Sequence, residues 1–122
     1  MTTNTLETLH DVRVLRCAAD GPSLDGEAAA LELIGDAYGH DAELVAVPVE
    51  RVADEFFRLR SGVAGAVVQK FVNYRLRLAV VGDISPHVEA STALRDFVYE
   101  SNQGGHLWFV SGHDALEDRL RR

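Results

Sequence analysis

The chain has 122 residues, with 47% hydrophobic and 25% charged, which suits one globular domain and is too short for two. Its 19 acidic and 12 basic residues give a net charge of −7, which argues against a nucleic-acid or anionic-membrane surface. No apolar run approaches the roughly 20 residues of a membrane span, and the N-terminus lacks the basic and apolar regions of a signal peptide. The single Cys17 excludes an internal disulfide. We expect one cytoplasmic domain over residues 1–122.

Strand and helix patterns alternate along the whole chain. In chain order the predicted elements are strands at 4–9 and 12–18, a helix at 26–38, a strand at 42–49, a short helix or irregular turn at 52–60, a helix at 61–75, a strand at 76–83, a helix at 85–103, a strand at 106–110 and a helix at 111–122. Gly39 is predicted to follow the first long helix, Pro86 to begin the third, and Gly104 with Gly105 to end it.

Apolar residues at helical spacing predict the inward face of each long helix. The predicted inward residues are Ala30, Leu31, Ile34, Ala37 and Tyr38 in the first helix, Ala64, Val67, Val68, Phe71 and Val72 in the second, and Ala90, Leu94, Phe97 and Val98 in the third. The order β-β-α-β-α-β-α-β-α predicts an α/β fold with a mixed, mostly parallel sheet, because single helices between apolar strands favour parallel crossovers. Sites in such sheets lie where strands end and the next helices begin.

This order of elements resembles the STAS domain of bacterial anti-sigma factor antagonists and sulphate-transporter tails. The stretch "LRSGVAGAVV" carries Ser61 before Gly62 at a helix start, as those domains carry a Ser or Thr before a glycine. The resemblance implies a regulatory domain that binds a protein partner and is switched by phosphorylation of Ser61. Leu59 and Arg60 stand where those domains commonly have an acidic residue.

Longer blocks resemble a bacterial family known as domain of unknown function 4180. The blocks "FFRLRSGVAG", "QKFVNYRLRLAVVGDIS" and "ALRDFVYESNQGG" carry this resemblance, which covers residues 28–110. It implies no established activity.

Ser61 also has a purely structural interpretation. Its hydroxyl oxygen can accept a hydrogen bond from an unpaired N–H in the first turn of the helix. The same N–H groups and the helix dipole would favour a phosphate on Ser61 or a bound anion, with Arg60, Gly62, Asp83 and Ser85 as further anion- or ligand-binding candidates. The two roles are compatible.

Two helix ends carry polar clusters that predict a structural brace. "NYR" places Asn73 and Arg75 at the end of the second long helix, and "YESN" places Glu100 and Asn102 near the end of the third. We expect Glu100 to pair with Arg75 or Arg77, at the end of the domain opposite Ser61.

Catalytic and metal-binding motifs are weak in this chain. Asp83 and His87 are the candidates for an acid–base pair. The residues "SGHD" at 111–114 contain the types of a hydrolase triad, but neighbours in sequence cannot form its geometry, and helix capping explains them better. The five histidines form no close pair, so we expect neither a metal nor a cofactor.

Two functions of different classes follow from these observations. The first is a non-catalytic regulatory domain that binds a protein partner through the surface around Ser61 and the Asp83–Ser85 loop. The second is a small-ligand protein or modest acid–base enzyme with its pocket at the same edge, where an exposed Trp108 or Phe109 would favour a ligand or subunit contact; coverage of both rings by helices is the alternative. The open sheet edge is compatible with a homodimer.

Overall fold

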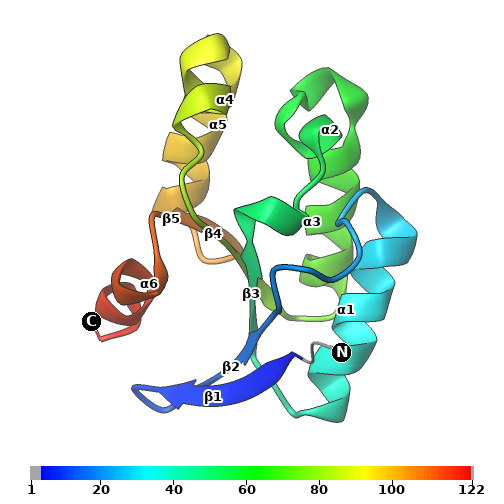
Figure 1. The fold of residues 1–122 in the computed structure, drawn as a ribbon, viewed down its shortest axis with the longest axis vertical. Coiled ribbons are helices and arrows are strands. Elements are labelled where there is room, and N and C mark those ends of the chain that lie inside the picture. The colour runs from blue at the N-terminus through cyan, green and yellow to red at the C-terminus, as the bar shows by residue number, and fades with distance from the viewer. Residues whose placement is uncertain (1–3, 122) are drawn as a thin grey trace.

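Five strands of the described chain form one sheet in which each strand pairs with its neighbours in sequence. The computed structural model describes residues 4–121 (Figure 1), with strands β1 (Thr5–Leu9), β2 (Val12–Arg16), β3 (Leu44–Pro48), β4 (Arg77–Val81) and β5 (Leu107–Val110). β1 runs antiparallel to β2, and β2 to β5 run parallel. The mixed, mostly parallel sheet predicted from the sequence is confirmed.

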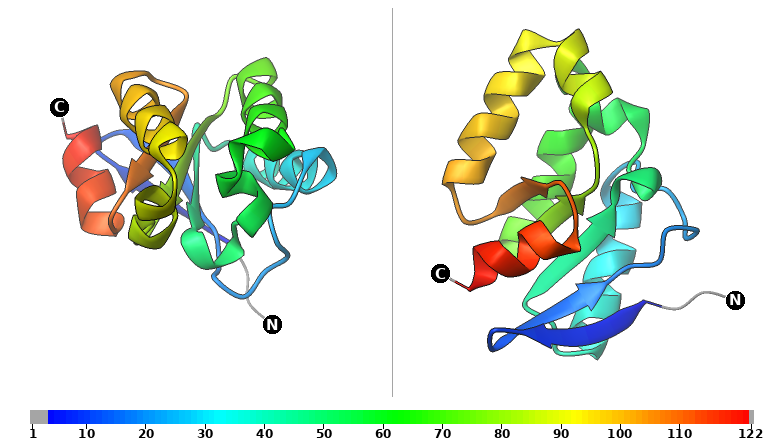
Figure 2. Two further views of the ribbon diagram at one scale, coloured as in Figure 1. Left: turned by 90° about the horizontal axis from the view of Figure 1, so that it is seen from above. Right: turned by 60° about the vertical axis from the view of Figure 1, so that its left-hand side comes forward.

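Helices cover both faces of this sheet. They are α1 (Glu27–Gly39), α2 (Asp54–Phe57), α3 (Val63–Asn73), α4 (Ser85–Ala90), α5 (Thr92–Gln103) and α6 (His113–Leu120), with the single turns η1 (Val49–Arg51) and η2 (Leu59–Ser61) around α2. Crossovers of one hand between strands in sequential order place their helices on the same face. α1, α3 and α5 accordingly contribute to one core, whereas α6 lies on the opposite face (Figures 1 and 2).

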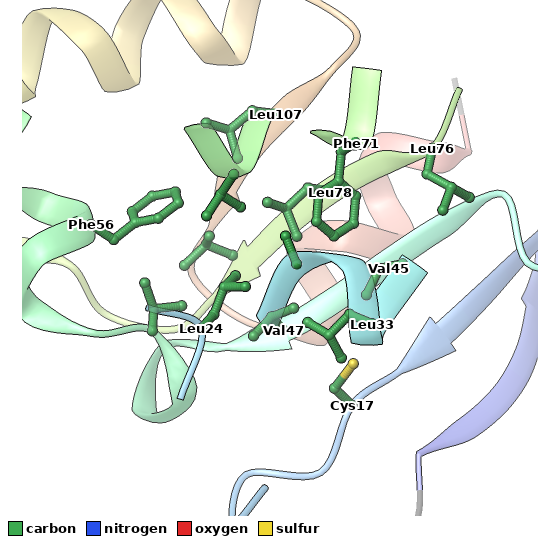
Figure 3. Packing of buried hydrophobic residues seen from close by; sticks show 14 of the residues in the cluster. Cys17, Leu24, Leu33, Val45, Val47, Phe56, Phe71, Leu76, Leu78 and Leu107 are labelled. Atoms are coloured by element: carbon green, nitrogen blue, oxygen red, sulfur yellow. The ribbon is translucent and has the colours of Figure 1, made fainter. Parts of the chain in front are cut away.

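The larger core lies between the sheet and these crossover helices. Alternation along β4 sends Leu78 and Val80 into it, and the fully buried rings of Phe56 and Phe71 belong to the same cluster. Figure 3 shows Leu78 with these two rings. A smaller cluster on the other face joins Leu116 and Leu120 of α6 to the sheet. Trp108 and Phe109 face opposite sides, and each is only 8% exposed, so neither ring offers an exposed aromatic surface.

Two details of α1 differ from the sequence prediction. Leu31 and Tyr38 are 40% and 55% exposed, and Leu33 is buried in their place. α1 packs on α3 as well as on β3, so its buried face is rotated toward Leu33. Gly39 is the last helical residue, and Asp41 takes the left-handed conformation after the helix, with a φ of 57°.

The helix predicted over residues 85–103 is two helices. The break falls at Ser91, whose backbone is extended, with φ −150° and ψ 115°. The Ser91 hydroxyl accepts a hydrogen bond from the backbone N–H of Leu94 at 3.1 Å, so Ser91 is the N-cap of α5. The apolar period continues through this break, because Leu94 is buried and Phe97 and Val98 pack on the same core. Ala90, the last residue of α4, is exposed instead.

The cap at Ser91 gives a direct test of this break. Ser91→Ala is expected to lower the free energy of unfolding by about 1 kcal/mol, because an N–H in the first turn of α5 loses its acceptor. Urea denaturation followed by circular dichroism measures the change. Ser23→Ala is the matched control, since the exposed Ser23 side chain makes no hydrogen bond within residues 4–121. Equal stability of the two variants would show that Ser91 does not cap α5.

Candidate functional site

The segments that follow β3 and β4 meet at the carboxyl edge of the sheet. η1, α2 and η2 follow β3 and lead into α3, while α4 follows β4. Figure 1 shows α2 and α4 facing each other beyond the sheet. Ser61, Asp83 and His87 all lie in these segments, as the rule for open α/β sheets led us to expect.

Ser61 is exposed and links two helices. Its hydroxyl donates a hydrogen bond to the carbonyl oxygen of Glu55 in α2, at 2.6 Å, and its oxygen accepts one from the N–H of Val63, at 3.2 Å. Gly62 is the N-cap residue of α3 and has a φ of 78°, a left-handed conformation that glycine adopts without strain. Ser61 therefore satisfies one N–H of the first turn from the position before the cap.

A cavity of about 620 Å³ separates the α2–η2 segment from α4 and the start of α5. His87 lies on its wall and stacks on Phe57, with ring centroids 4.0 Å apart and an interplanar angle of 11°. Arg58 and Arg60 line the opposite part, and both are exposed. The exposed Asp54 also lines the cavity, so its rim carries two positive side chains and one negative one. The cavity thus combines an apolar wall with a rim that is basic on balance, in a protein of net charge −7.

Asp83 forms a local turn on the other side of α4. Its Oδ1 accepts hydrogen bonds from the hydroxyl of Ser85 and from the N–H of Ser85, the latter at 2.9 Å. These bonds, the side-chain bond first, lower the pKa of Asp83 below its usual value. Asp83 lines a separate cavity of about 610 Å³ with Val88 and Phe109, whereas His87 faces the first cavity. The structure does not bring Asp83 and His87 together as an acid–base pair.

The four polar residues at the helix ends do not form one brace. Asn73 accepts a hydrogen bond from Gln69, and Arg75 has a φ of 58° after the end of α3. Asn102 accepts a hydrogen bond from the backbone N–H of Phe109 at 2.8 Å, which satisfies an outward-facing donor of the edge strand β5. Within residues 4–121, Glu100 makes no ion pair or hydrogen bond, and Arg77 instead stacks on Trp108.

The "SGHD" residues form neither a triad nor a side-chain cap. Gly112 is the N-cap residue of α6, and no side chain caps this helix. Nδ1 of His113 is buried without a hydrogen-bond partner in the described part of the chain. Burial, and secondly the positive charge of Arg16, lower the pKa of His113. Within the same residues, no cluster of His, Cys, Asp and Glu has the arrangement of a metal site.

One charged residue of the described chain is buried, and no pattern in the sequence predicted it. Arg51 is only 5% exposed, although it follows a predicted strand at the edge where sites are expected. Its position directly after "VAVPVE" was the available signal. The hydrogen bonds that surround it come from residues 4–22, which no local pattern connects with residue 51.

The lowered pKa of His113 predicts a pH-dependent contribution to stability. The contribution is fully present above the unfolded pKa of about 6.5 and is lost as the pH falls below it, because the unfolded chain binds the proton more readily. Wild-type protein should therefore lose more unfolding free energy than His113→Asn between about pH 8 and about pH 5.5. Urea denaturation at both values measures this, with the exposed His106→Asn as control. Equal losses in wild type and His113→Asn would contradict the prediction.

Of the two resemblances drawn from the sequence, comparison with known proteins confirms only the one to domain of unknown function 4180. No curated protein and no solved structure matches the chain. No helix within residues 4–121 has the length and apolar character needed to cross a membrane. Residues 9–120 match the family described as domain of unknown function (DUF4180). Because the match extends from the β1–β2 turn to the end of α6, the chain belongs to the DUF4180 family.

Proposed function

We propose that this protein is a cytoplasmic, STAS-like regulatory domain that binds a protein partner at the α2–α4 cavity and is switched by phosphorylation of Ser61. The observation that carries the proposal is the position of the Ser61 hydroxyl. It is exposed, precedes an 11-residue helix, and bonds to both α2 and α3. A modifying enzyme can reach the hydroxyl, and its modification would alter the contacts of Ser61 with both α2 and α3.

A phosphate on Ser61 would alter this turn in two ways. The hydroxyl proton would be replaced, so the hydrogen bond from Ser61 to the Glu55 carbonyl would be lost. The dipole of α3 and the unpaired N–H groups at its start would stabilise the phosphate. Arg60, the preceding residue in the chain, could form a charge-assisted hydrogen bond with it. The charge of the phosphate would compete with any acidic partner for the basic rim of the cavity.

The composition of the cavity indicates the kind of partner. Phe57, Leu59 and the stacked His87 provide an apolar surface, while Arg58 and Arg60 provide positive charge. A protein segment that carries apolar and acidic side chains complements both parts. An acid–base enzyme fits the geometry less well, because Asp83 and His87 line different cavities.

The phosphorylation can be tested without ambiguity of site. Trypsin cleaves after Arg60 and Lys70, and the peptide of residues 61–70 contains Ser61 as its only hydroxyl residue. Protein purified from its native host should yield this peptide, or its extended form from residue 59, with the mass of one added phosphate. Ser61→Asp should lose the partners that wild-type protein and Ser61→Ala retain in affinity purification, because it places a negative charge at the same helix start.

The matched control is Ser111→Asp. Ser111 is exposed at the same edge but lines the cavity on the other side of α4, so this variant adds equal charge at a distance from the turn. It should retain the partners. An unmodified 61–70 peptide together with identical partners for all variants would reduce Ser61 to a helix-capping residue and would overturn the proposal.

A further inference from the structure

Arg51 is a buried cation without a carboxylate partner among residues 4–121. Its Nε donates to the carbonyl oxygen of Pro22 at 2.9 Å, and its Nη1 donates to the carbonyl oxygen of Ala18 at 3.1 Å and contacts Oδ1 of Asn4 at 3.5 Å. No acidic oxygen of the described chain lies within ion-pair distance of the guanidinium. Neutral carbonyl dipoles therefore hold a charge that is 95% removed from solvent contact, and an anion would stabilise it further.

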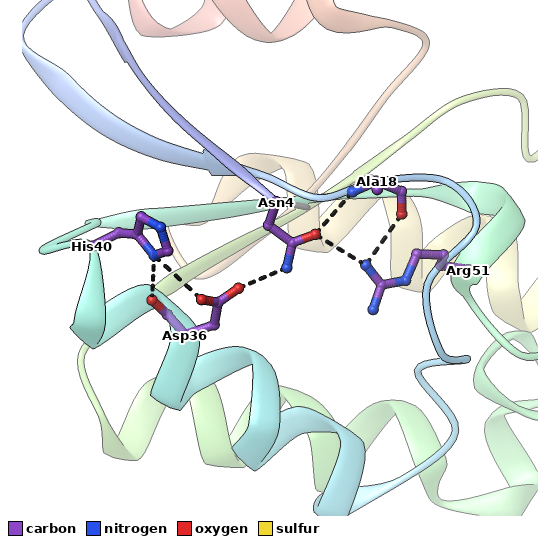
Figure 4. A network of polar contacts seen from close by, with 5 residues as sticks. All are labelled: Asn4, Ala18, Asp36, His40 and Arg51. Carbon is purple, nitrogen blue, oxygen red and sulfur yellow. Dashed lines mark hydrogen bonds and ion pairs between the residues drawn. The ribbon is translucent and has the colours of Figure 1, made fainter. Parts of the chain in front are cut away.

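The loop before α1 is fitted closely around this guanidinium. A Cβ atom at Gly21 would lie 2.5 Å from the Arg51 Cζ and 2.7 Å from Nη1, so no larger residue fits there without moving the arginine. Figure 4 shows the second terminal nitrogen, Nη2, directed away from Ala18 and Asn4 and toward the space beside α1. Nη2 makes no hydrogen bond within the described chain. Within residues 4–121, its two N–H groups have no acceptor and can donate to a ligand.

That space is a cavity of about 280 Å³ with both apolar and polar lining residues. The apolar lining residues are Pro22, Leu24, Ala29 and Leu33, and the polar ones are Arg51, Asn4, Asp36 and Glu32. Liquid water occupies about 30 Å³ per molecule, so the cavity holds a ligand of roughly ten non-hydrogen atoms.

Two acidic residues line the same cavity as the arginine. Asp36 accepts a hydrogen bond from Nδ2 of Asn4 at 2.8 Å through Oδ2, and its Oδ1 lies 3.3 Å from Nδ1 of His40 (Figure 4). Glu32 lies one turn earlier on α1. One cation and two carboxylates disfavour a dianionic ligand such as phosphate. They suit a small molecule that carries both a carboxylate and an ammonium group.

We propose that the cavity between α1 and the loop at 18–24 binds a free α-amino acid with an aliphatic side chain. The carboxylate of the ligand binds Nη2 of Arg51, its ammonium group binds the carboxylates of Asp36 and Glu32, and its side chain packs on Leu24 and Leu33. This site is separate from the Ser61 turn and does not rest on the proposed phosphorylation.

The test is an NMR titration of the dialysed, ¹⁵N-labelled protein with L-valine, L-leucine, L-isoleucine and L-methionine. At least one is expected to shift the amide signals of Ala18 and Gly21 and the side-chain amide of Asn4 in a saturable manner. For L-leucine, the matched probes are 3-methylbutylamine, which lacks the carboxylate, and 4-methylpentanoate, which lacks the ammonium group. Each should bind at least about tenfold more weakly than the amino acid, because each leaves a charged group of the site unpaired.

Variants separate ligand binding from the structural role of Arg51. Glu32 is exposed, so Glu32→Gln should fold normally and weaken amino-acid binding several-fold, while Glu100→Gln on α5 should leave it unchanged. Arg51→Gln should abolish binding, with the dispersion of its spectrum as the check on folding. The proposal would be overturned if none of the four amino acids caused saturable shifts of the Ala18 and Gly21 amide signals. It would also be overturned if L-leucine, 3-methylbutylamine and 4-methylpentanoate bound equally well.

Discussion

Parallel pairing of β2 to β5 in chain order governs the architecture of this protein. Each connection between parallel strands must cross a face of the sheet, and crossovers of one hand bring successive helices to the same face. The segments that follow β3 and β4 then emerge at one edge, and α6 is left to cover the other face. Both candidate sites follow from this: the Ser61 turn closes the connection after β3, and Arg51 lies at the start of that connection.

The fold was predicted well where apolar residues recur at the regular spacing of a strand or a helix. The buried runs of β3, β4 and β5 and the apolar faces of α1, α3 and α5 allowed only one order of elements, which the structure confirms. Local sequence patterns gave wrong predictions where contacts between distant elements decide which helix face is buried or where a helix ends. Leu33 rather than Leu31 is buried because α1 also packs on α3, and the apolar face of residues 92–98 concealed the break at Ser91.

Site residues could be predicted from the sequence only where their interaction partners are close to them in the chain. A hydroxyl before a glycine at a helix start identified Ser61 as a helix-start residue, because the N–H groups that it satisfies are its neighbours in sequence. The predicted pairing of Glu100 with Arg75 or Arg77 is absent from the described residues, where Arg77 lies over the Trp108 ring and Asn102 bonds to the free edge of β5. The burial of Arg51 was not predicted, because its partners Asn4, Ala18 and Pro22 belong to a segment about 30 residues or more away in the chain. The burial of a charged residue is decided by such distant contacts.

The most direct test of a regulatory role for the carboxyl edge of the sheet is hydrogen–deuterium exchange. It compares the free protein with its complex with the partner that copurifies with the unphosphorylated form. Slower exchange is expected in the bound state over residues 57–60 and 86–93, which line the α2–α4 cavity, and over the adjoining turn at 61–63. Exchange over α6, on the opposite face of the sheet, should not change. Protection confined to α6, or protection that persists on both cavity walls when Ser61 carries a phosphate, would contradict this role.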